Sequence, residues 1–336
     1  MKKITLLVLY LVSLLLVGFF GYWFAKNGTE IVLKSPGAKI IPRPLEKYTY
    51  DNLKIRGGIA SEVKIERTLK VEDEFTSYLF SYVTNGKRVT GQMNIPNGAG
   101  PYPTILMFRG YAEKETYKIG TGTAPSAKVY ANNGYLTFAP DFLGYGESDV
   151  RTEDQIEARL ENYTTALDAL ASIKNIKEAD SNNVFIWGHS NGGHLAVATL
   201  EISGKPIPTT LWAPVTAPFP HSALFFQDEL FDKGKTLRKD IAKFEELYDV
   251  FKYSPDNYID WLKAPIQLHQ GTLDESVPKK WSDEFVKVLK EKEKDNGAIS
   301  STEITYFVYQ GTDHNMRPAW DTVVARDMMF FRKHTK

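Results

Sequence analysis

"FIWGHSNGGH", residues 185–194, places one serine, Ser190, in the middle of a cluster of glycines. Three apolar or aromatic residues run straight into Gly188, and an apolar stretch over 195–200 follows the cluster. This order is typical of a buried strand, a tight turn and a helix. The turn is either a plain connection or a strained turn that holds the Ser190 hydroxyl clear of the backbone.

The chain around this turn alternates between two kinds of pattern. Continuous apolar runs are typical of strands buried on both faces, and they predict strands at 104–108, 134–140, 183–188, 209–214, 264–271 and 303–311. Helical patterns lie between or after them at about 124–132, 153–173, 192–202, 279–295 and 319–334. Repeated strand–helix–strand units imply an α/β fold, with a mainly parallel central sheet covered on both faces by helices.

Three further segments complete the predicted organisation. From about residue 61, stretches rich in β-branched and aromatic residues predict additional strands, two of them joined by the turn "TNGK". The polar stretch 27–60 carries several Pro and Gly residues and is expected to be a linker, which leaves 61–336 as one domain. Residues 217–260 break the alternation and predict a helical insertion between two strands, in the role of a lid.

The motif around Ser190 fits G-x-S-x-G, directly after a predicted strand and at the start of a predicted helix. This is the setting of a nucleophile elbow, in which a strained turn exposes a serine hydroxyl. Gly188 and Gly192 flank the serine because a β-carbon at either position would collide with neighbouring backbone. Ser190 is therefore the candidate nucleophile, with a structural turn as the alternative.

A serine hydroxyl needs a base in contact with it, and the base needs a carboxylate to orient it. After a nucleophile elbow, the acid and then the histidine follow along the chain, each on a loop after a strand. The stretch "IQLHQGTLDESVP" turns at Asp274, and "YFVYQGTDHNM" turns at His314. We expect Asp274 as the acid and His314 as the base, with Glu275 and Asp313 as alternatives for the acid.

Over about residues 88–334 the chain resembles the α/β-hydrolase superfamily. Within it, the chain is similar to the catalytic domain of the prolyl oligopeptidase (S9) peptidases and to dienelactone-hydrolase-like esterases. The matching motifs are "PYPTILMFRG", "APDFLGYGESD", "WGHSNGG", "YSPDNYIDWLKAPIQLHQGTLDESVP" and "GTDHN". The resemblance implies the α/β-hydrolase fold and a catalytic triad of Ser190, Asp274 and His314.

The oxyanion of an acyl-transfer reaction needs hydrogen-bond donors. The backbone N–H of Asn191, directly after the nucleophile, is the first candidate. The second is expected from the turn after the strand at 104–108, and we assign it to the backbone N–H of Tyr111. Some S9 enzymes use a tyrosine hydroxyl from this turn instead.

Arg109 and Tyr145 are the candidate substrate-binding side chains. Relatives commonly carry His-Gly or a tyrosine in the turn after 104–108, and Arg109 departs from that pattern. Three roles for Arg109 stay open. Its side chain could assist the oxyanion, hold a substrate carboxylate, or pair with Asp141 or Glu147.

The first residues, "MKKITLLVLYLVSLLLVGFFGYWFAK" (1–26), carry Lys2 and Lys3 and then no charge until Lys26. As a helix, the stretch 4–25 would cover about 33 Å, the thickness of a hydrocarbon core. We expect an uncleaved transmembrane anchor, with the rest of the chain outside the cytoplasm. A cleaved signal, and hence a secreted protein, is the alternative, although the residues before Lys26 fit a cleavage site poorly.

Composition narrows the partners further. The 41 basic and 41 acidic side chains balance, which gives no reason to expect nucleic acid. There is no cysteine, which excludes disulfides, thiol nucleophiles and thiolate metal sites. No pair of histidines has zinc-helix spacing with a nearby carboxylate, and we expect no metal and no cofactor. The expected partners are a small peptide or ester substrate and a membrane; no pattern bears on oligomeric state.

The sequence thus predicts a membrane-anchored, extracytoplasmic serine hydrolase that works through an acyl-enzyme. The S9-like motifs favour a peptidase acting on short peptides. A carboxylesterase is the alternative, because the roughly 60 residues before the first strands leave no room for the propeller that gates many S9 enzymes. An inactive hydrolase fold used as a surface binding module is the third interpretation, and the intact triad disfavours it.

Overall fold

The computed structural model describes residues 18, 41–227, 231–295 and 303–336. The chain divides into two compact units, Met1–Pro42 and Arg43–Lys336. The predicted anchor or signal over 1–26 lies outside the described residues, except for Gly18. Within the parts that are described, no helix is both long and apolar enough to cross a membrane.

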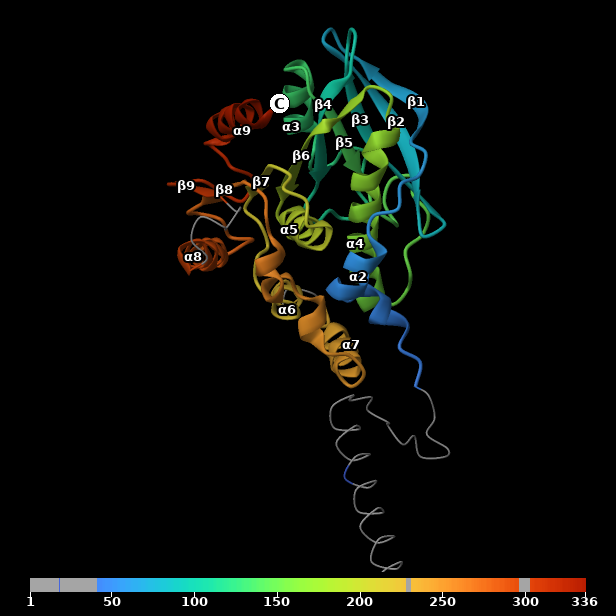
Figure 1. The fold of residues 1–336 in the computed structure, drawn as a ribbon, viewed down its shortest axis with the longest axis vertical. Helices are drawn as coiled ribbons and strands as arrows, with labels where there is room; N and C mark the ends of the chain where they lie inside the picture. The colour runs from blue at the N-terminus through green and yellow to red at the C-terminus, as the bar shows by residue number, and fades with distance from the viewer. Residues whose placement is uncertain (1–17, 19–40, 228–230, 296–302) are drawn as a thin grey trace, which may run out of the picture. The chain divides into compact units, whose positions relative to one another are not determined.

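The described part of Arg43–Lys336 is built on a nine-stranded sheet with the order β1-β2-β3-β5-β4-β6-β7-β8-β9 (Figure 1). In chain order the strands are β1 (Lys64–Val71), β2 (Phe75–Thr84), β3 (Lys87–Pro96), β4 (Tyr102–Phe108), β5 (Leu136–Pro140), β6 (Ala179–His189), β7 (Thr209–Trp212), β8 (Ile266–Gly271) and β9 (Ile304–Tyr309). Strands β1, β2, β3 and β5 pair antiparallel, and the pairs from β5 to β9 are parallel. The predicted mainly parallel sheet is confirmed.

The hairpin between β2 and β3 forms at the predicted turn. Asn85 and Gly86 connect the strands with φ angles of 48° and 77°, and Thr84 pairs with Lys87 at the ends of the two strands. Two positive φ angles are the requirement of a two-residue hairpin turn, and the sequence Asn-Gly meets it at little steric cost.

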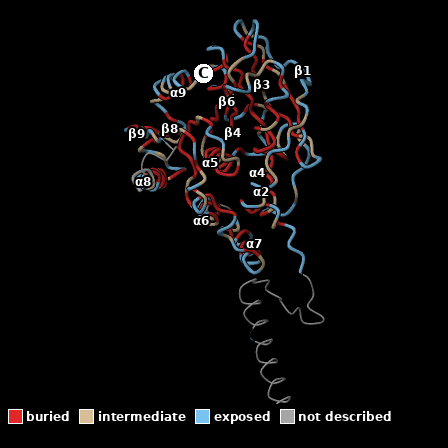
Figure 2. Tube along the Cα trace, viewed as in Figure 1, coloured by how far each residue is buried: buried red, intermediate tan, exposed pale blue. Residues whose placement is uncertain are grey.

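Helices cover both faces of the sheet. They are α2 (Tyr50–Arg56), α3 (Ala124–Asn132), α4 (Gln155–Ser172), α5 (Asn191–Ser203), α6 (His221–Phe225), α7 (Lys235–Glu245), α8 (Lys279–Asp295) and α9 (Trp320–His334). Strand β4 shows the two faces: Ile105 packs in a core cluster with α3 and α9, and Leu106 packs in another with α4 and α5. This alternation follows from the two-residue period of a strand. Helix α5 is buried along most of its length (Figure 2).

The segment before β1 corrects the predicted linker. Over the second half of 27–60 the chain forms a 3₁₀ helix, η1 (Pro44–Tyr48), and then α2. The side chains of Tyr48, Tyr50 and Leu53 are fully buried and belong to the same core cluster as α4 and α5. The folded unit therefore begins at Arg43 rather than at residue 61.

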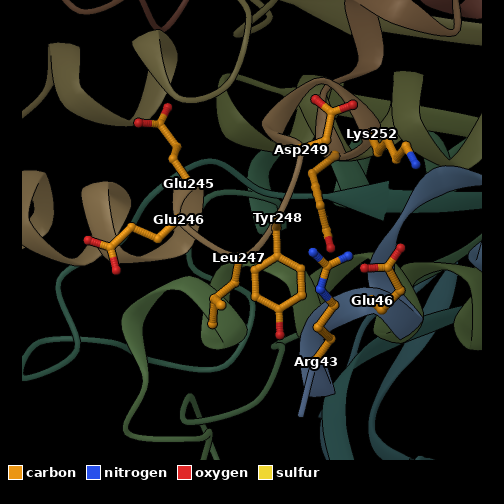
Figure 3. Close-up of a pocket in the computed structure, with 9 residues that line it drawn as sticks. Arg43, Glu46, Glu245, Glu246, Leu247, Tyr248, Asp249 and Lys252 are labelled. Atoms are coloured by element: carbon orange, nitrogen blue, oxygen red, sulfur yellow. The ribbon is translucent and has the colours of Figure 1, made fainter. Parts of the chain in front are cut away.

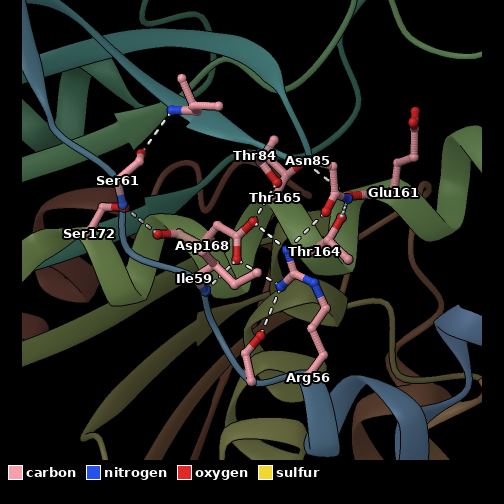
Figure 4. Close-up of polar contacts among 12 residues, drawn as sticks. Arg56, Ile59, Ser61, Thr84, Asn85, Glu161, Thr164, Thr165, Asp168 and Ser172 are labelled. Atoms are coloured by element: carbon pink, nitrogen blue, oxygen red, sulfur yellow. Dashed lines mark hydrogen bonds and ion pairs between the residues drawn. The ribbon is translucent and has the colours of Figure 1, made fainter.

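A polar network fixes the end of this segment to α4 (Figure 4). The Arg56 guanidinium donates to both carboxylate oxygens of Asp168, each at 2.8 Å. The same carboxylate accepts the Ile59 N–H at 2.7 Å and the Thr84 hydroxyl at 2.6 Å. Bidentate Arg–carboxylate pairs of this kind are geometrically specific. Asp168 thus joins two separate segments of the chain, 56–59 and the end of β2, to α4.

The predicted helical insertion over 217–260 is confirmed between β7 and β8. It contains α6, α7 and the short 3₁₀ helices η3 (Val250–Tyr253), η4 (Pro255–Asn257) and η5 (Ile259–Trp261). Leu237, Ile241 and Phe244 lie on one side of α7 and pack into the main core cluster. A cavity of about 300 Å³, lined by side chains of both charge signs, lies between η1 and the segment after α7 (Figure 3). Beside it, the Leu45 N–H donates to the Tyr248 hydroxyl at 3.1 Å.

Candidate active site

Ser190 is the single residue between β6 and α5. Its backbone has φ 57° and ψ −122°, which non-glycine residues rarely adopt and which costs roughly 1–3 kcal/mol. The carbonyl of Ser190 accepts the N–H groups of Gly193 and Val215 at 2.9 and 3.0 Å. These contacts from the helix and from the loop after β7 hold the strained turn in place.

The glycines around Ser190 are required by close backbone approach, as predicted. A β-carbon at Gly188 would lie 2.6 Å from the carbonyl oxygen of Gly192. A β-carbon at Gly192 would meet the carbonyl oxygen of Phe108, at the end of β4. The strained turn is therefore packed directly against the neighbouring strand, where only glycine fits.

Asp274 and His314 come together at the ends of β8 and β9. Asp274 Oδ2 lies 2.9 Å from His314 Nδ1, and Asp274 Oδ1 accepts the N–H groups of Ser276 and Val277 at 2.9 and 2.8 Å. The Asp274 side chain is 1% exposed and the His314 side chain 16%. Because β6, β8 and β9 are parallel, Ser190 follows its strand at the same edge of the sheet.

The electrostatics of Asp274 suit an acceptor. Burial by itself would raise the pKa of this carboxyl, but the hydrogen bond with His314 and donors from Val277 and Gln270 outweigh it and lower the pKa below its ordinary value. The carboxylate is ionised at neutral pH and can only accept, so His314 carries a proton on Nδ1 and leaves Nε2 free to take another.

The two alternative acids do not meet His314 in this way. Asp313 Oδ1 accepts the N–H groups of Asn315 and Arg317 within its own loop, and Glu275 is exposed. The structure therefore pairs His314 with Asp274, as the order of the motifs predicts.

His189 is a residue of this site that the sequence did not single out. Its Nε2–H donates to the carbonyl oxygen of His314 at 3.0 Å, and the two imidazole rings lie 4.7 Å apart, centre to centre. Burial, and then the neighbouring His314 ring, lower the pKa of His189 to about 4, so this ring is neutral at neutral pH. Its place directly before Ser190, at the end of β6, was the available signal.

The turn after β4 passes beside the nucleophile. A β-carbon at Gly110 would lie 2.9 Å from the Ser190 Cβ, so Gly110 brings the backbone next to the serine side chain. The Tyr111 side chain is 74% exposed, and its hydroxyl donates to Glu113 at 2.9 Å. Asn191 is the first residue of α5, where the N–H has no partner within the helix. Both predicted backbone donors thus belong to segments that border Ser190.

The Arg109 side chain stabilises the backbone of this turn through hydrogen bonds. Its buried guanidinium donates to the carbonyl oxygens of Gly110 and Asp141, each at 2.8 Å, and lies 4.0 Å from the centre of the Tyr145 ring. Tyr145 in turn donates to the carbonyl of Ala112 at 3.1 Å. Both side chains therefore fix the backbone of the turn, and a direct contact of either with substrate stays a prediction.

The two carboxylates proposed as partners of Arg109 are bound elsewhere. Asp141 accepts hydrogen bonds from Thr90 and Tyr117, and Glu147 pairs with Arg67. Arg109 reaches Asp141 only at its backbone carbonyl.

Aromatic side chains from the insertion meet α8 close to the Asp274 loop. Phe225 and Phe226 lie 4.8 and 6.1 Å from the Trp281 ring, centre to centre, and both are about 40% exposed. Trp281 also packs with Val277, whose N–H binds Asp274. The two rings therefore leave apolar surface exposed beside the Asp274 loop.

Comparison with known proteins agrees with this geometry. Residues 123–336 match the sequence profile of the prolyl oligopeptidase family. The chain belongs to this family. It is accordingly a serine hydrolase, and the α/β-hydrolase fold is confirmed.

Two known proteins are similar in sequence to this member of the prolyl oligopeptidase family. The uncharacterized peptidase YtmA of Bacillus subtilis is 25% identical over 209 residues, which cover 60% of this chain and 74% of that protein. Dipeptidyl peptidase family member 6 of Caenorhabditis elegans is 22% identical over 267 residues. The match covers 74% of this chain and 34% of that protein. This chain therefore spans only about a third of the longer relative.

Solved structures share the fold at low identity. An acetyl xylan esterase from Paenibacillus sp. R4 has a TM-score of 0.63 at 17% identity, covering 88% of this chain and 96% of the other. Acetyl xylan esterase 1 from Thermoanaerobacterium has a TM-score of 0.60 at 15% identity, covering 92% and 99%. A putative dipeptidyl aminopeptidase IV from Bacteroides ovatus has a TM-score of 0.54 at 15% identity, and the match covers 82% of this chain and 36% of that one.

Proposed function

We propose that Ser190, His314 and Asp274 form the catalytic triad of a serine peptidase that acts on short peptides. The observation that carries this proposal is the hydrogen bond between His314 and Asp274 at the sheet edge where the strained Ser190 turn also lies. Membership of the prolyl oligopeptidase family supports the same three residues in the same order along the chain.

In the proposed reaction, Ser190 Oγ attacks the carbonyl carbon of the substrate while its proton moves to His314 Nε2. The Asp274 carboxylate stabilises the imidazolium that forms. The backbone N–H groups of Asn191 and Tyr111 bind the oxyanion of the tetrahedral intermediate. His314 then gives its proton to the leaving amine, and water releases the acyl group from Ser190 by the reverse sequence of proton transfers.

A peptide rather than an ester is favoured by the family and by the Bacillus subtilis relative, which is named a peptidase. Because an amine leaves only when protonated, a peptidase needs its general acid held in place. The His314 loop is held by Asp274 on one side and by His189 on the other. An ester substrate is the second candidate, since two solved acetyl xylan esterases match this chain over almost their whole length.

We also propose that residues 4–25 anchor the protein in a membrane, with the hydrolase unit outside the cytoplasm. The support is the uninterrupted apolar stretch after Lys2 and Lys3. This proposal is independent of the chemistry at Ser190.

The full-length protein should be treated with a fluorophosphonate probe and assayed on a matched pair of substrates, an aminoacyl p-nitroanilide and the p-nitrophenyl ester of the same acyl group. Ser190→Ala should abolish labelling and lower kcat at least about a thousandfold. Ser181→Ala, an exposed serine at the other end of β6, is the control and should behave as wild type.

Turnover of the anilide supports the peptidase. Hydrolysis of the ester alone would make the protein an esterase, and labelling that survives in Ser190→Ala would place the nucleophile elsewhere.

A further inference from the structure

A cavity of about 170 Å³ lies beside α5, where the loop after β7, η4 and α8 converge. Its walls are mainly apolar and include Val197, Ile259, Trp281 and Phe285. The cavity adjoins Val215, whose N–H holds the Ser190 carbonyl. Neither the triad residues nor the oxyanion donors line it.

Glu201 is a fully buried acidic residue in the wall of this cavity. It lines the space, it is 0% exposed, and neither of its carboxyl oxygens has a hydrogen-bond partner among the residues that the structure describes. Burial, and then the negative charge of Asp256, raise its pKa well above the ordinary value. It also lies in the last turn of α5, where the helix dipole disfavours negative charge. A buried acid in such surroundings is costly unless something binds it.

The other polar groups that line the cavity indicate that a partner of Glu201 would carry a positive charge. Thr216 Oγ1 also has no partner among the described residues, and the exposed carboxylates of Asp256 and Glu284 line the same space. Burial, and then the charge of Arg159, lower the pKa of His194 to about 4, so this lining residue is neutral at neutral pH. None of the described residues that line the cavity is a lysine or an arginine.

We propose that this cavity binds a small organic cation, an ammonium group on an apolar body, whose charge stabilises the ionised form of Glu201, so that in the complex the Glu201 carboxylate is the counter-ion. The ammonium N–H groups supply donors to both Glu201 oxygens and to Thr216 Oγ1. The apolar body packs against Ile259 and Phe285, and Trp281 lines the same space. A bare metal ion fits less well, because among the described residues no three His, Asp or Glu side chains come together as a group that could hold one. The proposal does not depend on the chemistry at Ser190.

Calorimetric titration of the full-length protein with benzylammonium, and with benzyl alcohol as the neutral analogue, tests the proposal. Wild type should bind benzylammonium saturably and benzyl alcohol at least about tenfold more weakly. Glu201→Gln keeps the shape and removes the charge, and it should weaken benzylammonium binding at least about tenfold. Glu62→Gln, at an exposed carboxyl remote from the cavity, is the control and should bind as wild type.

Two further variants keep the result interpretable. Thr216→Val retains the side-chain size and should weaken benzylammonium binding severalfold, which tests the site even if Glu201→Gln fails to fold. Ser190→Ala should bind benzylammonium as wild type does, so a wrong nucleophile assignment is distinguishable from a wrong cation site. Equal binding of benzyl alcohol, unchanged binding in Glu201→Gln, or no binding at all would show a cavity that holds only water and would overturn the proposal.

Discussion

At the residue scale, His189 acts on the proposed base without touching the reacting atoms. Its Nε2–H and its ring both contact His314, so it fixes the loop that carries the imidazole. His189→Phe keeps an aromatic ring against His314 and removes only the hydrogen bond. We expect kcat to fall about tenfold, with KM unchanged, because the base is less well positioned.

Steady-state kinetics at several pH values measure this effect. His334→Phe, in α9, is the control variant and should keep the wild-type rate. An unchanged kcat, or an effect on KM alone, would contradict a positioning role for His189.

His194, one helical turn after Ser190, makes stability depend on pH. Its pKa is about 4 in the folded protein, through burial and the charge of Arg159, and about 6.5 in an unfolded chain. Between these values only the unfolded chain binds the proton. The free energy of unfolding therefore decreases as the pH falls from about 6.5 to about 4, by up to ~1.4 kcal/mol per pH unit from this residue.

His194→Gln removes this titration, so its free energy of unfolding should depend less steeply on pH than that of wild type over the same range. Urea denaturation at pH 4.5, 5.5 and 7 measures both slopes. Parallel pH dependences for the two proteins would mean that His194 is not kept neutral by the fold.

At the element scale, the Arg56–Asp168 pair connects α2, the approach to β1 and the end of β2 to α4. The Asp168 side chain is 1% exposed, so Arg56→Met leaves a buried carboxylate without its counter-charge. We expect this variant to lose about 3 kcal/mol of the free energy of unfolding. Arg67→Met breaks a pair whose side chains are 50% and 44% exposed, and because solvent screens that pair it should lower the free energy of unfolding far less than Arg56→Met does.

Chemical denaturation of the two variants, side by side, makes the comparison. If both variants lost the same free energy of unfolding, burial of the Asp168 carboxylate would not make its ion pair more important for stability than an exposed pair.

The helix α2 shows why a short element escapes sequence reasoning. Prolines and glycines around it are typical of a linker, and seven residues are too few for a helical period to stand out. A weak signal was present, because Thr49 accepts the Asn52 N–H as an N-cap and precedes the buried pair Tyr50 and Leu53. What fixes the helix is packing against α4 and α5, which are distant in sequence.

At the scale of the whole molecule, the apolar stretch 4–25 predicts how the protein partitions. An uncleaved anchor should keep the full-length protein with the membrane fraction through alkaline carbonate washing, because that treatment removes only peripheral proteins. Fractionation followed by N-terminal sequencing is the measurement. Release into the soluble fraction with a new N-terminus near Lys26 would establish a cleaved signal instead.

The sheet and the order of the site residues were predictable because they depend on local signals: apolar runs for the strands, the glycines around Ser190, and loops that end at Asp274 and His314. The surroundings of Arg109 were not predictable. Its guanidinium binds the Asp141 carbonyl and stacks on Tyr145, contacts that arise only after β4 and β5 pair. The same holds for Glu201, whose isolation depends on α8 and the insertion packing over α5.

The insertion lies in the crossover between the parallel strands β7 and β8, whose pairing fixes both of its ends: it leaves after Trp212 and returns before Ile266, which pairs with Thr209. The entropy of closing such a loop grows only with the logarithm of its length, by about 0.6 kcal/mol for each doubling. Evolution can therefore lengthen, shorten or replace this segment at small cost while the two strands stay paired and Asp274 stays in place. We therefore expect homologues of this protein to differ in substrate preference first through changes in this segment. Such changes must keep the three buried apolar residues of α7, which pack into the core.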